Sequence, residues 1–74
     1  MTLKEIFVDR LLFLRHKNKY SQENIAQMLG MSASSYAKLE EGITRIHLEI
    51  LEKIAKVFNV EVVYLLGHDC GNNA

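Results

Sequence analysis

The sequence predicts an all-α domain, and three observations lead to this fold class. Apolar residues recur at helical spacing along most of the chain, and the strict alternation typical of strands is absent. The chain contains no proline to interrupt a helix. Its 74 residues, 49% hydrophobic and 24% charged, suit one small globular domain that must pack efficiently or share a surface with a partner.

Start and stop signals divide the chain into five expected helices. Serine is a good cap for a first turn, and glycine or asparagine suits the left-handed residue that ends a helix. On these signals the helices span about 3–17, 22–29, 33–41, 47–58 and 61–66. Ser21 and Ser32 precede the second and third helices, Gly30 and Gly42 follow them, and Asn59 closes the fourth.

Each expected helix has an apolar side that would face the core. In chain order the inward residues are Phe7, Leu11 and Leu14; Ile25, Ala26 and Leu29; Tyr36 and Leu39; Leu48, Leu51, Ala55 and Phe58; and Val62 and Leu65. The domain is expected to occupy residues 1–67, and residues 68–74 are expected to form a flexible tail.

The stretch GMSASSYAKLEEG, residues 30–42, contains the most informative spacing. Ala26 allows two short helices to cross closely, and Gly30, four residues later, allows a tight turn between them. Tyr36 and Leu39 follow as apolar anchors on the second of these helices. This is the spacing of a helix-turn-helix. The opposite face of the second helix is slim and polar, so we expect it to enter the major groove of DNA.

The chain resembles the Cro/CI-type helix-turn-helix domains, the lambda-repressor-like or XRE family, over residues 7–66. The resemblance rests on Leu14-Arg15, on SQENIAQMLGMSASSYAKLEEG at 21–42 and on LEILEKIAKVFNV at 48–60. It implies a compact five-helix lambda-repressor-like fold with the helix-turn-helix at the second and third helices. It also implies that the ligand is double-stranded DNA.

Roles for individual residues follow from the same resemblance. Gln22 would contact a phosphate and brace the recognition helix, and Arg15 would form a partly buried salt bridge with Glu40. Base contacts would come from the recognition helix, and the residues after Gly42 would lie near the DNA backbone. The expected DNA-binding set is Gln22, Ser32, Ala33, Ser34, Ser35, Tyr36, Lys38, Thr44 and Arg45.

Three positions depart from the family pattern. Ala33 stands where a polar reader is common and can offer only a methyl contact, for instance to thymine. Tyr36 replaces the usual aliphatic anchor. Its expected role is core packing, with its hydroxyl as a candidate phosphate contact. Ile46 and His47 replace a common Pro-Ser entry to the fourth helix.

The charge pattern bears on the partner. The net charge is zero, which counts against a strongly basic nucleic-acid binder. Positive charge is nevertheless concentrated in residues 1–20, which contain five lysines and arginines but only two carboxylates. We therefore expect DNA binding with only a moderate dependence on salt.

Apolar residues beyond the needs of the core predict an interface. Val63, Tyr64 and Leu66 are expected to form a homodimer contact. Leu12 and Phe13 add a patch that could instead meet a second protein. The leading hypothesis is a sequence-specific, repressor-like transcription regulator that binds a two-fold-symmetric operator as a homodimer. The alternative is a protein-interaction module on the same fold, such as an antitoxin or a partner-binding regulator.

The sequence also argues against an enzyme, a metal-binding protein and a membrane-spanning protein. No nucleophile, base and oxyanion arrangement can be assembled, so we predict a non-enzyme without a cofactor. His68, Asp69 and Cys70 are adjacent but have no second ligand cluster, so no metal site is expected. No apolar run approaches the length of a membrane span. The single cysteine precludes an internal disulfide, which fits a cytoplasmic location.

Overall fold

The computed structural model describes residues 2–68 and is all-helical over that range. Its five helices are α1 (Leu3–Lys17), α2 (Gln22–Leu29), α3 (Ala33–Glu40), α4 (Leu48–Phe58) and α5 (Val62–Leu65). The predicted all-α class and the five-helix order are confirmed. The expected bounds differ by one residue at some ends, because His47 and Glu61 are the N-caps of α4 and α5, and Glu41 and Leu66 are the C-caps of α3 and α5.

Local hydrogen bonds explain where the first three helices begin. The Thr2 hydroxyl accepts a hydrogen bond from the Glu5 amide, and the Glu5 carboxylate accepts one from the Thr2 amide. Ser21 and Asn24 make the same reciprocal pair at α2. At α3 the Ser32 hydroxyl accepts from the amide of the third helical residue. Each bond satisfies an amide that the first helical turn would otherwise leave unpaired.

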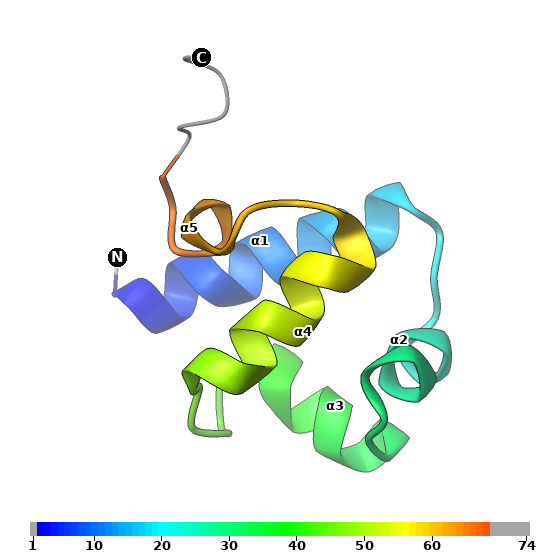
Figure 1. The fold of residues 1–74 in the computed structure, drawn as a ribbon. Coiled ribbons are helices and arrows are strands. Elements are labelled where there is room, and N and C mark those ends of the chain that lie inside the picture. The colour runs from blue at the N-terminus through cyan, green and yellow to red at the C-terminus, as the bar shows by residue number, and fades with distance from the viewer. Residues whose placement is uncertain (1, 69–74) are drawn as a thin grey trace.

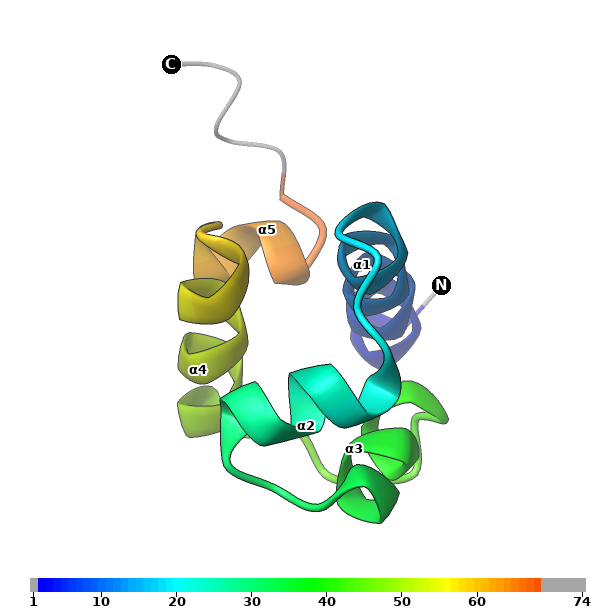
Figure 2. The ribbon, with the colours of Figure 1, turned by 90° about the vertical axis from the view of Figure 1, so that its right-hand side faces the viewer.

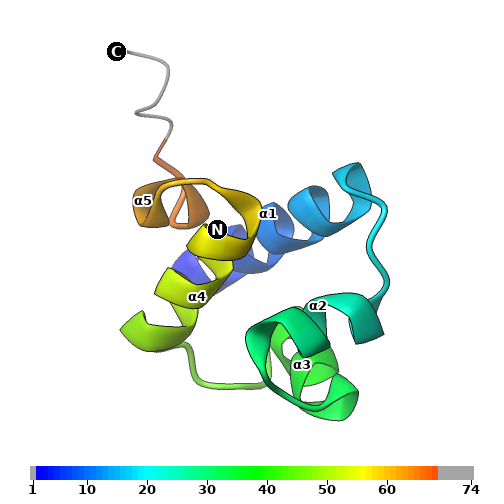
Figure 3. The same ribbon diagram turned by 45° about the vertical axis from the view of Figure 1, so that its right-hand side comes forward.

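The helices form two groups in space. α5 packs against both α1 and α4, whereas α2 and α3 pack against each other at the far end of the molecule. Figure 2 shows α5 at one end and α3 at the other, with α2 crossing α3 steeply. Figure 3 shows the same separation from an intermediate direction. α1 also contacts α3, and α4 contacts α2, so the two groups share one core.

The core lies between these groups and contains thirteen buried apolar residues among those described. They are Phe7, Leu11, Leu14, Ile25, Ala26, Leu29, Tyr36, Leu39, Ile50, Leu51, Ile54, Ala55 and Leu65. The inward faces expected for the first three helices are all buried. Of the expected pair on α5, Leu65 is buried and Val62 is partly buried.

The expected inner face of α4 is wrong in part. Leu48 is 65% exposed, whereas Ile50 and Ile54 are buried beside Leu51 and Ala55. The buried stripe is therefore rotated toward Ile50 and Ile54, which lie one turn apart at the edge opposite Leu48. Because α4 carries apolar residues around much of its circumference, spacing alone does not locate the centre of the stripe.

Two remaining expectations concern the ends of the chain and membranes. Residues 69–74, most of the expected tail, lie outside the described residues, so the boundary between domain and tail stays a prediction. Among the helices of residues 2–68, none is both long and apolar enough to cross a membrane.

The turn between α2 and α3 generates a test of the fold. Gly30 has φ +72°, and a Cβ added there would meet no heavy atom within 4 Å. Gly30→Ala should therefore be destabilising through backbone conformation rather than through a clash, by about 1–2 kcal/mol. Gly30→Asn should cost less, because asparagine tolerates the left-handed region. Urea unfolding of both variants checks this, and equal losses for alanine and asparagine would contradict it.

Candidate nucleic-acid interface

The turn that joins α2 to α3 is closed by backbone bonds. The Met31 amide donates to the Ala26 carbonyl at 2.9 Å, and the Gly30 amide donates to the Gln27 carbonyl at 3.1 Å. Ala26 is itself buried, so a small side chain lies near the turn and the two helices can approach each other closely. The pair forms a helix-turn-helix, with α3 as the second helix.

One side of α3 faces the core and the other is open. Tyr36 and Leu39 are buried, and the remaining side chains on the open side are small or polar. Ser34, Ser35 and Lys38 are exposed, and Ala33 and Ala37 are partly buried. The open side is slim enough to enter a major groove, because its only long side chain is Lys38.

The serines at the start of α3 have a structural role as well as an exposed position. The Ser32 hydroxyl accepts from the Ser35 amide at 3.1 Å and lies 3.0 Å from the Ser35 hydroxyl. Past the C-terminus of α3, Thr44 is partly buried and Arg45 is exposed. Apart from Tyr36, the expected contact residues therefore come from three segments: partly buried Gln22 at the start of α2, the beginning and open side of α3, and the connection to α4.

Tyr36, which belongs to the expected DNA-binding set and whose expected role is core packing, lies in the core. Its side chain is completely buried, and its hydroxyl has no hydrogen-bond partner among the described residues. A phosphate contact would require this hydroxyl to reach the surface. Tyr36 is therefore a core residue, and burial raises the pKa of its hydroxyl, as does the nearby Glu40 carboxylate.

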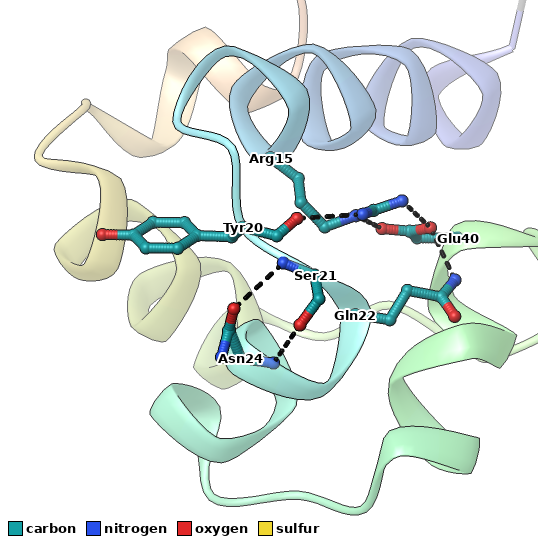
Figure 4. A network of polar contacts seen from close by, with 6 residues as sticks. All are labelled: Arg15, Tyr20, Ser21, Gln22, Asn24 and Glu40. Carbon is teal, nitrogen blue, oxygen red and sulfur yellow. Dashed lines mark hydrogen bonds and ion pairs between the residues drawn. The ribbon is translucent and has the colours of Figure 1, made fainter.

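The carboxylate of Glu40, at the end of α3, is the centre of a polar network (Figure 4). The Arg15 guanidinium donates to both carboxylate oxygens, with Nε 2.5 Å from Oε2 and Nη2 3.1 Å from Oε1. Its Nη1 donates to the Tyr20 carbonyl at 3.1 Å. Nε2 of Gln22 donates to Oε1 of Glu40 at 2.9 Å. Residues of α1 and α2 are thus bound directly to α3, and the segment between them is bound to Arg15.

This ion pair is largely shielded from solvent, since the Arg15 and Glu40 side chains are only 13% and 7% exposed. Burial alone would raise the pKa of Glu40. The hydrogen bonds from Arg15 and Gln22, the neighbouring Tyr36 hydroxyl and the charge of Arg15 together outweigh burial and hold that pKa below its ordinary value. The pKa of Arg15 is raised, chiefly by its hydrogen bond to Glu40. Both groups are therefore charged at neutral pH.

Two features of this network are not predictable from the sequence pattern. The resemblance implies that Gln22 braces the recognition helix, but Glu40 as its bonding partner is visible only in the structure. The Tyr20 carbonyl as a partner of Arg15 is likewise visible only there. The nearest signal in the sequence was Ser21, because a cap at that position directs the next residue, Gln22, into the first turn of α2.

The residues expected at a dimer contact are only partly exposed. Val63 is 41% exposed, whereas Tyr64 and Leu66 are partly buried and pack against the core. The Arg10 guanidinium lies 4.4 Å from the centre of the Tyr64 ring. On α1, Phe13 is 54% exposed and lies beside the Lys17 ammonium group, and Leu12 is partly buried. Tyr64 and Leu66 thus cover the domain's own core at least in part.

The prediction that the chain has no metal site concerns residues that the structure describes only in part. Within residues 2–68, no group of three or more histidine, cysteine, aspartate or glutamate side chains could hold a metal ion. Asp69 and Cys70, two of the three candidate ligands, lie outside the described residues.

A double-mutant cycle tests the coupling between Arg15 and Glu40. Glu40→Ala should destabilise the domain, because it leaves the Arg15 charge shielded from water without its carboxylate partner. Adding Arg15→Ala should recover part of that loss, with a coupling energy on the order of 1–3 kcal/mol. Thermal or urea unfolding measures the four corners of the cycle. Losses that simply add would show that the pair does not contribute as a unit.

Comparison with known proteins agrees with this geometry. A family model described as helix-turn-helix matches residues 11–65. The chain is 39% identical over 62 residues to the HTH-type transcriptional regulator AnsR of Bacillus subtilis (strain 168), covering 84% of the chain and 53% of that protein. It is 32% identical over 62 residues to the uncharacterized HTH-type transcriptional regulator YobD of the same strain, covering 84% of the chain and 55% of that protein. The chain thus spans about half the length of these relatives, and no solved structure matches it. With the helix-turn-helix in place within a five-helix frame, the chain belongs to the Cro/CI-type helix-turn-helix family.

Proposed function

We propose that this protein is a sequence-specific DNA-binding transcription regulator that inserts α3 into the major groove. The observation that carries the proposal is the open side of α3, where small side chains surround a single long cation, Lys38. Lys38 can donate to the acceptors of guanine, and Ser34 can pair with several base edges. Ala33 can contribute a methyl contact to thymine.

Contacts with the DNA backbone would orient this helix. The exposed Ser35 hydroxyl at the start of α3 and the exposed Arg45 beyond its end are candidates for phosphate contacts. Gln22 can reach a phosphate only with the part of its amide that Glu40 does not use. A neutral chain with few cations near the groove should neutralise few phosphates, so the dependence of affinity on salt should be moderate.

The finer parts of the hypothesis concern assembly and biological role. We infer a repressor-like homodimer on a two-fold-symmetric operator, acting in the cytoplasm without catalysis. In such a dimer two recognition helices would lie about one DNA turn apart, roughly 34 Å. Val63 on α5 and Phe13 on α1 are both exposed, and these two helices pack against each other. Both side chains support an interface that involves α1 and α5. A protein-interaction module such as an antitoxin is the second candidate, favoured by zero net charge and by this same apolar surface.

Two variants should separate base reading from positioning. Lys38→Ala should weaken a selected cognate duplex more than random DNA, because a base contact contributes about 1–3 kcal/mol of discrimination. Gln22→Ala should weaken both duplexes by similar factors. Fluorescence anisotropy after selection of bound sequences measures both affinities.

The matched control for Lys38 is Lys53→Ala, an exposed lysine on α4. This variant should change neither affinity appreciably. Equal effects of Lys38→Ala and Gln22→Ala on discrimination would contradict the assigned roles. If no sequence is enriched at modest salt, the interaction module becomes the better hypothesis.

The proposed dimer contact is tested by charge insertion. Val63→Asp should shift a dimer toward monomer in sedimentation velocity, because an aspartate at the interface would have to be buried without a partner. Val63 is a better choice than Tyr64 or Leu66, because those side chains pack against the core and their loss would damage the fold. The matched control is Leu48→Asp on α4, which is more exposed and lies outside α1 and α5. A Val63→Asp variant that sediments like the wild type would place the interface elsewhere.

A further inference from the structure

A groove of about 300 Å³ opens on the side of the domain where α1 begins. Its apolar lining comes from α1, from the segment before α4, from α4 itself and from the end of α5. The apolar lining residues are Leu3, Phe7, Ile46, Leu51 and Leu66. Phe7 and Leu51 are core residues, so the groove reaches down to the hydrophobic core.

The charged side chains that line this groove are both cations, Lys4 and Arg45. Among residues 2–68, neither is in a salt bridge with a carboxylate. The nearby acidic side chains Glu5, Asp9 and Glu41 line a separate hollow, which also includes Lys4. The groove therefore combines an apolar lining with a positive rim, on which Lys4 lies between the groove and the acidic hollow and Arg45 lines the groove alone.

The apolar surface here is larger than the core requires. Leu3 is 64% exposed, although it is large and aliphatic. Leu48, one helical turn before Leu51, is also mostly exposed, although it does not line the groove. Covering such surface is favourable by about 25 cal/mol for each Å² removed from water. An occupant with an apolar body would gain this energy.

We propose that this groove binds a small amphipathic carboxylate, with its apolar part against the lining and its carboxylate beside Lys4 and Arg45. The charges favour an anion, since a cation in the groove would meet the positive charges of Lys4 and Arg45 and no carboxylate in the lining. The volume lies at the lower end of the range for small-molecule sites, which favours a compact acid over a folded partner.

The site also has a consequence for DNA binding, and this part rests on the proposed function. Arg45 is one of the residues placed beside the DNA backbone above. A carboxylate that engages Arg45 removes a cation from the phosphates. The acid and DNA should therefore weaken each other's binding by the same factor, as thermodynamic linkage requires.

The test uses octanoate as the probe and methyl and amide NMR spectra of the free chain as the readout. Octanoate should give saturable shifts that cluster at Leu3, Ile46 and Leu66. Octylammonium, which has the same chain length and the opposite charge, should not bind there. Arg45→Gln and Lys4→Gln should each raise the dissociation constant of octanoate about threefold, as expected for a solvent-exposed ion pair.

Lys53→Gln is the matched control, because Lys53 is exposed but does not line this groove. It should leave octanoate binding unchanged. Octylammonium binding as tightly as octanoate, shifts spread over other surfaces, or an equal effect of Lys53→Gln would each overturn the site.

A second measurement separates the two proposals. Saturating octanoate should weaken binding to the cognate duplex, with the same concentration of acetate as the control for ionic strength. If octanoate binds but DNA affinity is unchanged, the sharing of Arg45 is overturned and the acid site stands. If no duplex binds at all, the proposed function fails, and the NMR titration still decides the groove.

Discussion

The carboxylate of Glu40 determines how the recognition helix sits in this domain. It accepts hydrogen bonds from Arg15 near the end of α1 and from Gln22 at the start of α2, while Arg15 also holds the carbonyl of Tyr20 between them. Two helices are therefore bound directly to the last residue of α3, and the segment between them is linked to it through Arg15. Because desolvation offsets much of the attraction in a shielded ion pair, its main consequence is orientation rather than stability.

The core and the exposed side of α3 depend on this arrangement together. Tyr36 and Leu39 bury one side of a helix only eight residues long, and so short a helix has little stability of its own. The Tyr36 ring is completely buried, and its hydroxyl lies near Glu40 with no hydrogen-bond partner among the described residues. The opposite side carries small or polar residues, with Lys38 as its one long side chain. A single helix thus supplies both an anchor and a slim outward surface.

Individual charged side chains have distinct roles, although the net charge of the chain is zero. Arg15 is committed to the interior network, and Arg10 lies over the Tyr64 ring. Lys38 and Arg45 remain exposed on either side of the end of α3, where DNA would approach. The apolar residues outside the fully buried core likewise fall into two groups. Tyr64 and Leu66 cover the core, whereas Leu3, Leu48 and Val63 remain available for a partner or ligand.

Features that depend on near neighbours along the chain could be predicted from the sequence. Capping serines, Gly30 and Asn59 mark helix ends through bonds and dihedral angles that span a few residues, so the five helices and the helix-turn-helix were predicted almost to the residue. Three features became visible only in the folded chain: the buried side of α4, the inaccessible hydroxyl of Tyr36 and the hydrogen bond from Gln22 to Glu40. These outcomes depend on contacts between distant segments, and a pattern with several apolar or polar choices on one helix does not select among them.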